Sequence, residues 1–402
     1  MNTDKILFLG CIVPRELQEE VNANNIGVSQ ASATEFQYKI IYGLEKNMQY
    51  PVKICNLMPV SSFPKNYKKA FIKRRQFSHS NGADDVNVGF LNVRILKQFL
   101  LGWSYKKELM KTYKGENFDK IICYSANTVL ISCMKRLKKK NTSIKTCLIL
   151  PDMPEFNNLR QDKSLIYNIY IRYLSKKFKK HLSFVDCFVL LTAASADYLE
   201  ISKPFIVMEG IAQIKESKDL EYKEPKGKMI LYTGSTNIQF GIKNLLEAFC
   251  KIETEDYLLV ICGCGDYDEK IRMASESDKR IIFRGNISHD EVIELQKSAT
   301  VLVNPRQNVG EYTKYSFPSK TMEYLSSGTP VVAYKLDGIP DEYDSYIHYV
   351  PDNTIETLRD VIVDVCEKDK QERETFGKRA QNFVIQNKNA AVQGKRILDL
   401  IR

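Results

Sequence analysis

The stretch FPSKTMEYLSSGTPVVAY, residues 317–334, predicts a short helix followed by a buried strand. Pro318 suits the first turn of a helix, where its missing N–H group costs nothing, so we expect the helix to begin one or two residues before it. The free amide groups of Ser319 and Lys320 then point out of the helix with partial positive charge. Ser319 adds a hydroxyl group and Lys320 adds a full charge. The start of this helix is therefore expected to bind an anion such as phosphate.

The sequence around this helix supplies two further groups. Upstream, VLVNPR at 301–306 predicts a buried strand that delivers Arg306 at its carboxyl end. Ligands of open parallel sheets bind at that end, so the guanidinium is expected to meet the same anion. Deeper along the helix, Glu323 could accept two hydrogen bonds from the vicinal hydroxyl groups of a ribose. A phosphate beside a ribose indicates a nucleotide.

Short apolar strands alternate with amphipathic helices twice along the chain, the pattern of doubly wound parallel sheets. The length of 402 residues exceeds what one core usually organises. We therefore predict an α/β fold of two Rossmann-like domains with a ligand-binding cleft between them. The expected parts are an N-terminal domain at 1–212, a polar linker at 215–228, a C-terminal domain at 228–371, and a final helix at 372–402 that returns to the N-terminal domain.

Composition excludes several classes of protein. With 44% hydrophobic and 27% charged residues, the chain has the composition of a soluble globular protein. No apolar run approaches the ~20 residues of a membrane-spanning helix, and no secretory signal is recognisable, so a cytoplasmic location is expected. The ten cysteines are scattered, and the close pair Cys262 and Cys264 lacks further ligands. Neither a metal site nor a cofactor is predicted.

Positive charge is concentrated in the first half of the chain. Residues 1–210 carry a net charge of +14 and the remainder carries −4. The basic clusters lie at 65–75, 135–140 and 176–181, and three interpretations stay open for them. They are solvated helix ends, a surface for anionic lipid on the cytoplasmic face of a membrane, or a nucleic-acid surface. No nucleic-acid-binding motif accompanies the charge, so nucleic acid is not an expected partner.

Segments of the C-terminal half follow one another in a recognisable order. They are YTG at 232–234, GIKNLLEAF at 241–249, LVICGCGDYDEKI at 259–271, the segment from IIFRG to VLVNPR at 281–306, FPSKTMEYLSSGTPVVAY at 317–334 and DGIPDEY at 337–343. On these motifs the chain resembles the retaining nucleotide-sugar glycosyltransferases of the GT-B type, family 4, and especially members that build bacterial polysaccharides. The resemblance is weaker over the N-terminal half, where the acceptor is expected to bind. It implies transfer of a sugar from a nucleotide-sugar donor to a glycan or lipid-linked glycan, with retention and without a metal.

The resemblance also implies roles for individual residues. Glu323 corresponds to the glutamate that binds the nucleotide ribose, while Ser319 and Lys320 face the diphosphate. The other donor-binding residues that it implies are Gly27 and Ser29 in an N-terminal loop, Gly234 and Ser235 beneath the nucleotide, Arg284 beside the base, and Tyr315, Ser316 and Pro318 at the start of the helix.

The chain departs from the family pattern in ways that bear on catalysis. Tyr315 stands where the family has a second glutamate near the transferred sugar. Ser235 and Phe240 stand where an arginine and a lysine usually meet the diphosphate, so either Arg306 and Lys320 supply that charge or activity is lost. Asp152 follows a strand after which the family often has a histidine; it is a candidate for the acceptor side or a simple turn carboxylate.

Three other functions stay open from the residues. An inactive glycosyltransferase-like binding module is compatible with Tyr315 and the missing loop cations. A nucleotide-sugar epimerase shares the architecture but needs acidic and histidine residues around the cleft. A dinucleotide-binding oxidoreductase is the weakest alternative, because GCGDY at 263–267 lacks the third glycine of the fingerprint.

Overall fold

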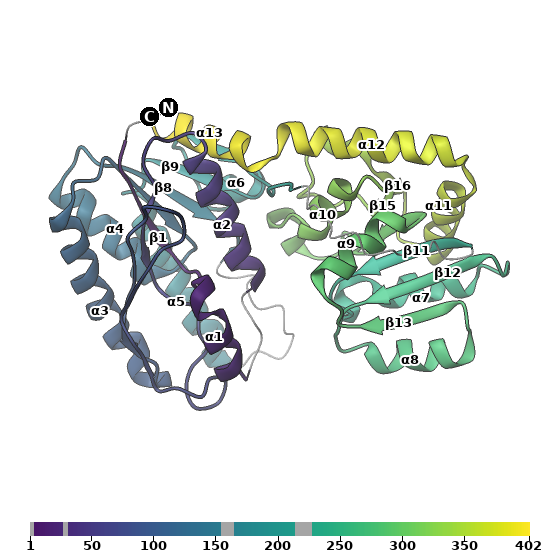
Figure 1. Ribbon diagram of the computed structural model, residues 1–402, viewed down its shortest axis with the longest axis horizontal. Helices are drawn as coiled ribbons and strands as arrows, with labels where there is room; N and C mark the ends of the chain where they lie inside the picture. Colours follow the sequence, from purple (N-terminus) through teal and green to yellow (C-terminus); the bar gives the residue numbers. More distant parts are fainter. Residues whose placement is uncertain (1–3, 27–30, 154–164, 214–226) are drawn as a thin grey trace. The chain divides into compact units, whose positions relative to one another are not determined.

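The chain divides into two compact units in the computed structural model (Figure 1). Unit 1 comprises residues 1–211 and 390–402, and unit 2 comprises residues 212–389. The division falls close to the predicted linker. The residues that the structure describes are 4–26, 31–153, 165–213 and 227–402.

Unit 1 is built around an eight-stranded sheet with the strand order β10-β9-β8-β7-β1-β2-β5-β4. Its strands, which include a small separate pair of β3 and β6, are β1 (Ile6–Gly10), β2 (Lys53–Asn56), β3 (Phe71–Ile72), β4 (Arg75–Phe77), β5 (Asp85–Asn87), β6 (Phe90–Leu91), β7 (Lys120–Tyr124), β8 (Lys145–Leu150), β9 (Cys187–Leu190) and β10 (Phe205–Val207). Its helices are η1 (Arg15–Leu17), α1 (Gln18–Asn24), α2 (Ala31–Glu45), α3 (Arg94–Gly115), α4 (Thr128–Lys140), α5 (Leu165–Leu182), α6 (Ala194–Tyr198) and α13 (Ala390–Leu400). The large sheet is parallel except for its edge strand β4.

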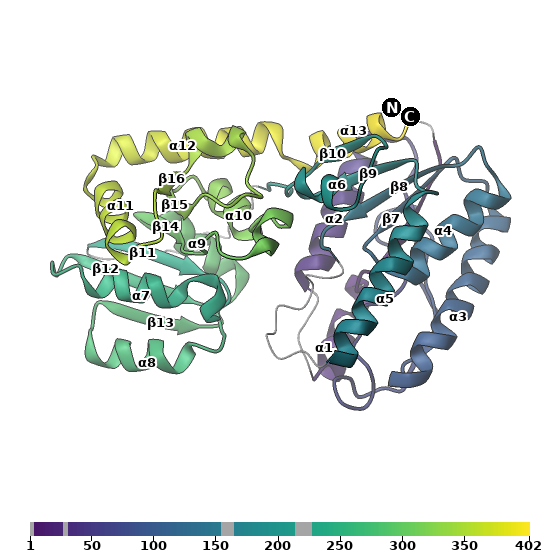
Figure 2. The ribbon, with the colours of Figure 1, turned by 180° about the vertical axis from the view of Figure 1, so that it is seen from behind.

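Helices cover both faces of this sheet. On one face α2 and α13 pack against the apolar side chains of β1, with Ile6, Phe8 and Ile397 in one buried cluster (Figure 1). The two helices approach closely because glycines meet at their contact: a Cβ atom on Gly394 would lie 2.1 Å from the backbone of Gly43. On the other face α3, α4 and α5 lie side by side (Figure 2).

Unit 2 contains a six-stranded sheet that is parallel throughout, with the order β13-β12-β11-β14-β15-β16. Its strands are β11 (Lys228–Thr233), β12 (Tyr257–Cys262), β13 (Ile281–Gly285), β14 (Val301–Asn304), β15 (Val331–Tyr334) and β16 (His348–Val350). Its helices are η2 (Ile238–Phe240), α7 (Ile242–Cys250), α8 (Asp268–Ser277), α9 (His289–Ser298), η3 (Glu311–Tyr315), α10 (Ser319–Ser327), η4 (Asp341–Tyr346), α11 (Ile355–Glu367) and α12 (Lys370–Asn387). The predicted α/β class with two Rossmann-like units is confirmed.

The C-terminal part differs from the single helix expected at 372–402. It forms two helices, of which α12 belongs to unit 2 and only α13 belongs to unit 1. The helical conformation ends at Lys388, whose carbonyl accepts a bond of 2.8 Å from the amide of Ala212 and whose ammonium donates to Glu342 at 2.6 Å. These bonds fix the chain at the point where α12 stops.

Two features of unit 1 were not expected from the sequence. The loop after the first strand contains α1, and the basic segment around residues 65–85 contributes β4 and β5 to the sheet. Both strands are three residues long and carry polar residues, so they leave no alternating pattern to recognise. Within the described residues, no helix combines the length and the apolar character that crossing a membrane requires.

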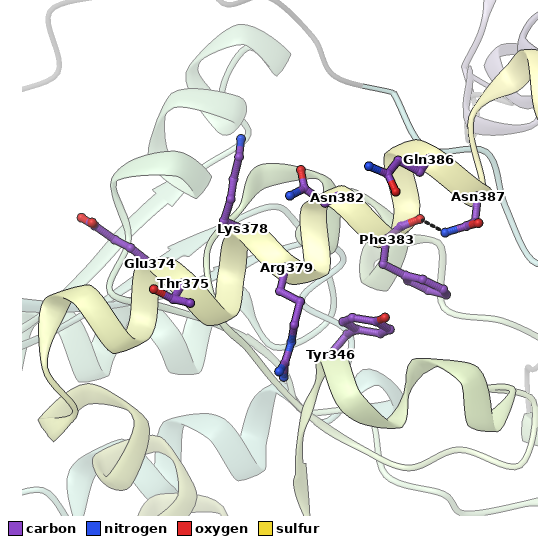
Figure 3. Close-up of a pocket in the computed structure, with 9 residues that line it drawn as sticks. All are labelled: Tyr346, Glu374, Thr375, Lys378, Arg379, Asn382, Phe383, Gln386 and Asn387. Atoms are coloured by element: carbon purple, nitrogen blue, oxygen red, sulfur yellow. Dashed lines mark hydrogen bonds between the residues drawn. The ribbon is translucent and has the colours of Figure 1, made fainter.

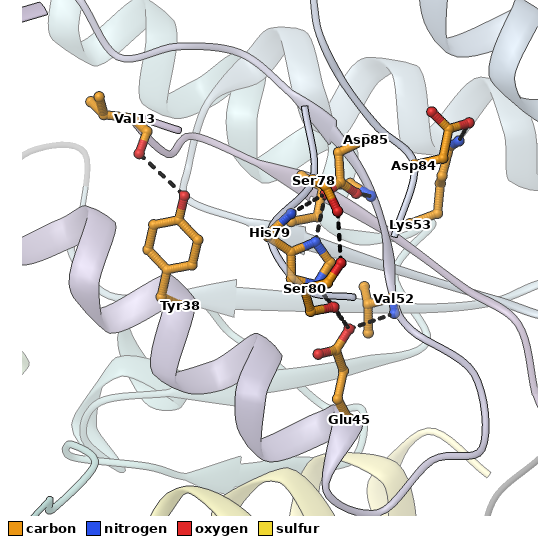
Figure 4. A network of polar contacts seen from close by, with 11 residues as sticks. Val13, Tyr38, Glu45, Val52, Lys53, Ser78, His79, Ser80, Asp84 and Asp85 are labelled. Carbon is orange, nitrogen blue, oxygen red and sulfur yellow. Dashed lines mark hydrogen bonds and ion pairs between the residues drawn. The ribbon is translucent and has the colours of Figure 1, made fainter. Parts of the chain in front are cut away.

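A buried polar cluster joins α2 to the edge of the unit 1 sheet (Figure 4). The ring of His79 lies between two carboxylates: Nδ1 is 2.6 Å from Asp85 Oδ2, and Nε2 is 2.8 Å from Glu45 Oε1. The other oxygen of Asp85 accepts from the amide of Ile54 in β2. Burial opposes protonation of the ring, but the two carboxylates outweigh it and raise the pKa of His79 to about 9. His79 is therefore a cation that ties three elements together at neutral pH.

Candidate functional site

The predicted anion-binding residues of unit 2 gather at the carboxyl ends of β11 and β14. From β11 the chain adds β12 and β13 on one side of the sheet and then returns to add β14 on the other. Thr233 ends β11, Arg306 follows β14, and α10 begins at Ser319. Ligands of open parallel sheets bind at such a switch point in strand order, so these residues occupy the expected position for a ligand site.

The N-terminus of α10 is open to a ligand. The helix begins at Ser319, slightly later than predicted, because Pro318 is extended (ψ 108°) and serves as the N-cap. No side chain caps this end, and the first internal bond runs from the amide of Thr321 to the carbonyl of Pro318 at 2.9 Å. The amides that precede Thr321 in the helix have no helical partner, which leaves them available to an anion.

Glu323 lies one turn into α10, with its carboxylate held from two sides. Lys320 Nζ is 3.1 Å and 3.3 Å from the two carboxylate oxygens, and Gln296 Nε2 donates to Oε1 at 2.7 Å. Burial favours the neutral acid, but the charge of Lys320 and these hydrogen bonds outweigh it and keep the pKa of Glu323 below its usual value. Glu323 is thus an ionised, oriented acceptor for hydroxyl groups.

A buried network supports Glu323 and was not predicted. The same Gln296 amide donates to Thr233 Oγ1 at 2.9 Å, and the hydroxyl of Tyr324 donates to the carbonyl of Thr233 at 3.1 Å. Thr233, Gln296 and Tyr324 are all buried. The only sequence signal for Gln296 is a polar residue on the apolar side of an amphipathic helix. The network joins α9, α10 and the end of β11, so it fixes the position of the Glu323 carboxylate.

Arg306 is a half-buried cation without a counter-charge. Its guanidinium lies 4.9 Å from the ring centroid of Tyr312 and 5.9 Å from that of Phe240, and Nη2 donates to Ser316 Oγ at 3.0 Å. The Nε–H group is buried without a hydrogen-bond partner, and no described acidic residue forms an ion pair with Arg306. Burial lowers the pKa of Arg306, although an arginine remains charged. A buried donor beside an unpaired charge is a combination that can bind an anion.

Sequence comparison assigns a family to this region of the chain. Residues 213–383 match the family model described as "Glycosyl transferases group 1". The chain carries a glycosyltransferase group 1 domain. The match spans nearly all of unit 2, including every residue of the network around Glu323, and it confirms the predicted glycosyltransferase at the level of this domain. Among curated protein sequences, none matches the chain.

Solved structures with the same fold cover the whole chain. Sucrose-phosphate synthase (tll1590) from Thermosynechococcus elongatus has a TM-score of 0.66 at 14% identity, with 98% of each chain covered. The E. coli protein described as "Trehalose-6-phosphate" bound with UDP-2-fluoro glucose has a TM-score of 0.64 at 10% identity, with 99% of each chain covered. Anabaena Alr3699/HepE in complex with UDP has a TM-score of 0.59 at 12% identity, with 98% of each chain covered. The chain therefore has the GT-B fold of these proteins.

In the glycosyltransferase domain, the predicted loop at Gly234 and Ser235 is tightly built. The amide of Gly234 donates to the carbonyl of Cys262 at 2.9 Å, and the carbonyl of Ser235 accepts from Tyr232 Oη at 2.6 Å. A Cβ atom on Gly263 would lie 1.7 Å from the carbonyl oxygen of Gly234, so only glycine fits there. The loops after β11 and β12 are therefore packed against each other at the carboxyl ends of these strands.

The other predicted donor-binding residues of unit 2 have partners outside the Glu323 network. Tyr315 ends η3, and its hydroxyl donates to Glu311 Oε1 at 3.2 Å. Ser316 accepts the bond from Arg306 and donates to the carbonyl of Tyr312. Arg284 of β13 lies 3.6 Å from Glu291 in an exposed ion pair. Of these, only Ser316 touches a cation of the site.

Two groups of predicted residues belong to unit 1. Asp152 follows β8, and desolvation of its carboxyl group raises its pKa to about 6. Burial raises the pKa of Tyr124, which ends β7, and the nearby negative charge of Asp152 raises it further. Gly27 and Ser29 lie outside the described residues.

The described residues outside this site form neither a metal-binding cluster nor a pocket that joins the Glu323 network. In the described part of the chain, no group of three or more His, Cys, Asp or Glu residues could hold a metal ion. A shallow pocket of about 660 Å³ lies along α12, where the ring of Tyr346 stacks on that of Phe383 at 4.3 Å (Figure 3). Arg379 beside it donates to the carbonyl of Ser345. None of the residues lining this pocket belongs to the Glu323 network or contacts Arg306.

Proposed function

We propose that the protein transfers a sugar from a nucleotide-sugar donor to a glycan or lipid-linked glycan acceptor, with retention and without a metal ion. The observation that carries this proposal is that two groups able to bind an anion lie together at the switch point of the sheet. They are the half-buried Arg306, which has no described counter-charge, and the N-terminus of α10, which no side chain caps. The glycosyltransferase group 1 match and the neighbours described with UDP and UDP-2-fluoro glucose support the donor class.

The donor would be held at both ends of its nucleoside diphosphate. Glu323, ionised and oriented by Gln296, accepts from the two ribose hydroxyls. The diphosphate lies against the amides at the start of α10 and between the positive charges of Arg306 and Lys320. These groups stabilise the negative charge that develops on the leaving diphosphate, a role that a metal ion can also fill.

The reaction consists of one bond exchange at the anomeric carbon. The bond from this carbon to the diphosphate oxygen breaks, and a bond from the acceptor hydroxyl oxygen forms on the same face of the sugar. The acceptor proton passes to the departing phosphate oxygen, so the products are the glycoside and the nucleoside diphosphate. We assign Asp152 to the acceptor side, where a carboxylate can hold the acceptor hydroxyl by a hydrogen bond.

Binding and turnover test this proposal separately. We expect calorimetry to detect a nucleoside diphosphate with the wild-type protein, and thermal shifts with a panel of nucleotide sugars to single out the donor. Product formation with that donor should persist in EDTA. Absence of nucleoside diphosphate binding, or activity that requires a divalent ion, would contradict the proposal.

A catalytically inactive binding module is the second candidate, and one observation favours it. The residue in the place of the family's second glutamate is Tyr315, a phenol already bonded to Glu311. A binding module would bind the nucleotide sugar through Glu323 and Arg306 but neither transfer nor hydrolyse the sugar. Prolonged incubation with the identified donor and water or acceptor, followed by mass spectrometry, distinguishes the two.

We also propose that the protein works peripherally on the cytoplasmic face of a membrane, because the acceptor class includes lipid-linked glycans and unit 1 is basic. The three basic clusters differ in this respect. In the 65–75 cluster, Arg74 forms a two-pronged pair with Glu108, while Lys69 and Arg75 share Glu20. Three of the six cations of that cluster are thus paired within the protein, so we expect most of the charge available to lipid to lie on α3, α4 and α5.

A further inference from the structure

The outer side of α3 carries an unusual stripe of side chains. Leu101, Tyr105 and Leu109 point into unit 1 and are buried. On the opposite side, Trp103 is 65% exposed and Leu100 is 41% exposed. Four exposed lysines continue along this side at helical spacing: Lys106, Lys107, Lys111 and Lys114. An exposed apolar patch that is rimmed by polar residues marks a site of interaction with a protein or a membrane.

The neighbouring helices extend this stripe into a basic face. Helices α3, α4 and α5 lie next to one another on one face of the sheet (Figure 2). Together they contain 16 lysine and arginine residues and one acidic residue, Glu108, which is already paired with Arg74. On α5, Tyr173 is 61% exposed and stands one turn before Lys176 and Lys177.

The lysines of this face have few internal counter-charges. Lys107 lies over the ring of Trp103 at 5.4 Å, and Lys179 lies over that of Tyr198 at 4.7 Å. Among the described residues, no ion pair involves any of the four exposed lysines of α3 or the lysines at 176, 177, 179 and 180. The face is therefore complementary to a surface with dense negative charge and an apolar layer beneath it.

We infer that the exposed face of α3, α4 and α5 docks on an anionic lipid bilayer, with Trp103 and Leu100 inserted at the level of the headgroups. This inference rests on the proposed function in one respect, the lipid-linked acceptor. Tryptophan favours the interface between headgroups and acyl chains, and the leucine beside it adds apolar area. Lysines around these two side chains meet the anionic headgroups. Nucleic acid would match the charge and stack on the indole, but it offers no apolar layer to Leu100.

Trp103 reports directly on this docking because it is the only tryptophan in the chain. With vesicles of phosphatidylcholine and phosphatidylglycerol, we expect its fluorescence to shift to shorter wavelength and to be quenched by lipids brominated on the acyl chain. Added salt should reverse both changes. Vesicles of phosphatidylcholine alone should leave the emission nearly unchanged.

Matched charge reversals separate this face from net charge. Replacing Lys107 and Lys111 by glutamate should lower vesicle co-sedimentation by about tenfold or more. The control pair Lys270→Glu and Lys279→Glu, two exposed lysines of unit 2, changes the net charge equally and should retain binding. A double Trp103→Ser, Leu100→Ser variant should keep its melting temperature, since both side chains are exposed, yet bind vesicles more weakly.

Several results would overturn the inference. They are co-sedimentation without a change in Trp103 emission, equal binding to neutral vesicles, equal losses in the two charge-reversal pairs, or a larger emission shift with single-stranded RNA than with anionic vesicles. The test of the proposed activity is separate from this one. A Trp103 emission shift without nucleoside diphosphate binding supports docking and refutes the proposed activity. Nucleoside diphosphate binding without a Trp103 emission shift supports the donor site and refutes docking.

Discussion

Replacing Arg306 is expected to weaken nucleotide binding without weakening the fold. The guanidinium is half-buried, its Nε–H group has no partner, and no described carboxylate neutralises its charge. The cost of removing this cation from water is therefore already present in the free protein. A diphosphate that arrives beside it gains a charge-assisted hydrogen bond with little further desolvation of the cation.

The size of the effect follows from that contact. Loss of one charge-assisted hydrogen bond costs roughly 1.5–3 kcal/mol, so Arg306→Met should weaken nucleoside diphosphate binding about 10- to 150-fold. The thermal stability of the free protein should stay the same or rise, because methionine fills the space between Tyr312 and Phe240 without burying a charge. Binding and stability thus move in opposite directions.

Calorimetry with the nucleoside diphosphate and thermal melting of the free protein measure the two effects. Arg306→Lys is the matched control: it keeps the charge but loses the planar fork, so its affinity should lie between those of the wild type and Arg306→Met. An affinity within twofold of the wild type for Arg306→Met would refute the assignment of Arg306 to the diphosphate. A large loss of stability would mean that the guanidinium is a structural group.

Three further predictions concern single residues. Gln296→Leu removes the amide donor that Thr233 and Glu323 share. It should therefore lower the unfolding free energy by about 1–3 kcal/mol in urea denaturation, and it should also weaken nucleotide binding. The pKa of His79 is about 9 in the folded protein and about 6.5 in the unfolded chain, so protonated His79 should stabilise the fold by on the order of 3 kcal/mol. This stabilisation should be complete below pH 6.5 and disappear as pH rises through 9. It is measured as the difference in unfolding free energy between wild type and His79→Gln at several pH values. Transfer activity should rise as pH increases through about 6 if ionised Asp152 holds the acceptor, and Asp152→Asn should abolish this rise while leaving nucleotide binding unchanged.

The positions of the candidate-site residues could be predicted where they follow from one local pattern. Pro318, Ser319, Lys320 and Glu323 belong to a single helix start, and the helix geometry alone brings the amides and the carboxylate to one end. Arg306 was predictable because a buried strand ends directly before it. Such features depend on a few neighbouring residues and on the rule that ligands bind at the carboxyl ends of parallel strands.

Contacts between distant residues could not be predicted in the same way. Gln296 is 27 positions from Glu323 and belongs to another helix, so no pattern within α9 indicates that it orients a carboxylate. The basic cluster at 65–75 resembled a free cationic surface, yet Arg75 pairs with Glu20, 55 positions away. Pairing over such distances depends on how strands and helices pack, which local sequence does not specify.

In the proposed function, the two cations of the candidate site differ in what they give up when a diphosphate binds. Lys320 already holds Glu323, with contacts of 3.1 Å and 3.3 Å to its oxygens, so turning toward a phosphate costs part of that ion pair. The ribose hydroxyls that then reach Glu323 replace the lost contact, which couples recognition of the ribose to recognition of the phosphate. Arg306 has no such pair to break. In the proposed function Arg306 supplies the uncompensated positive charge for the diphosphate, and the absence of an ion pair to a described residue is the physical reason that it can.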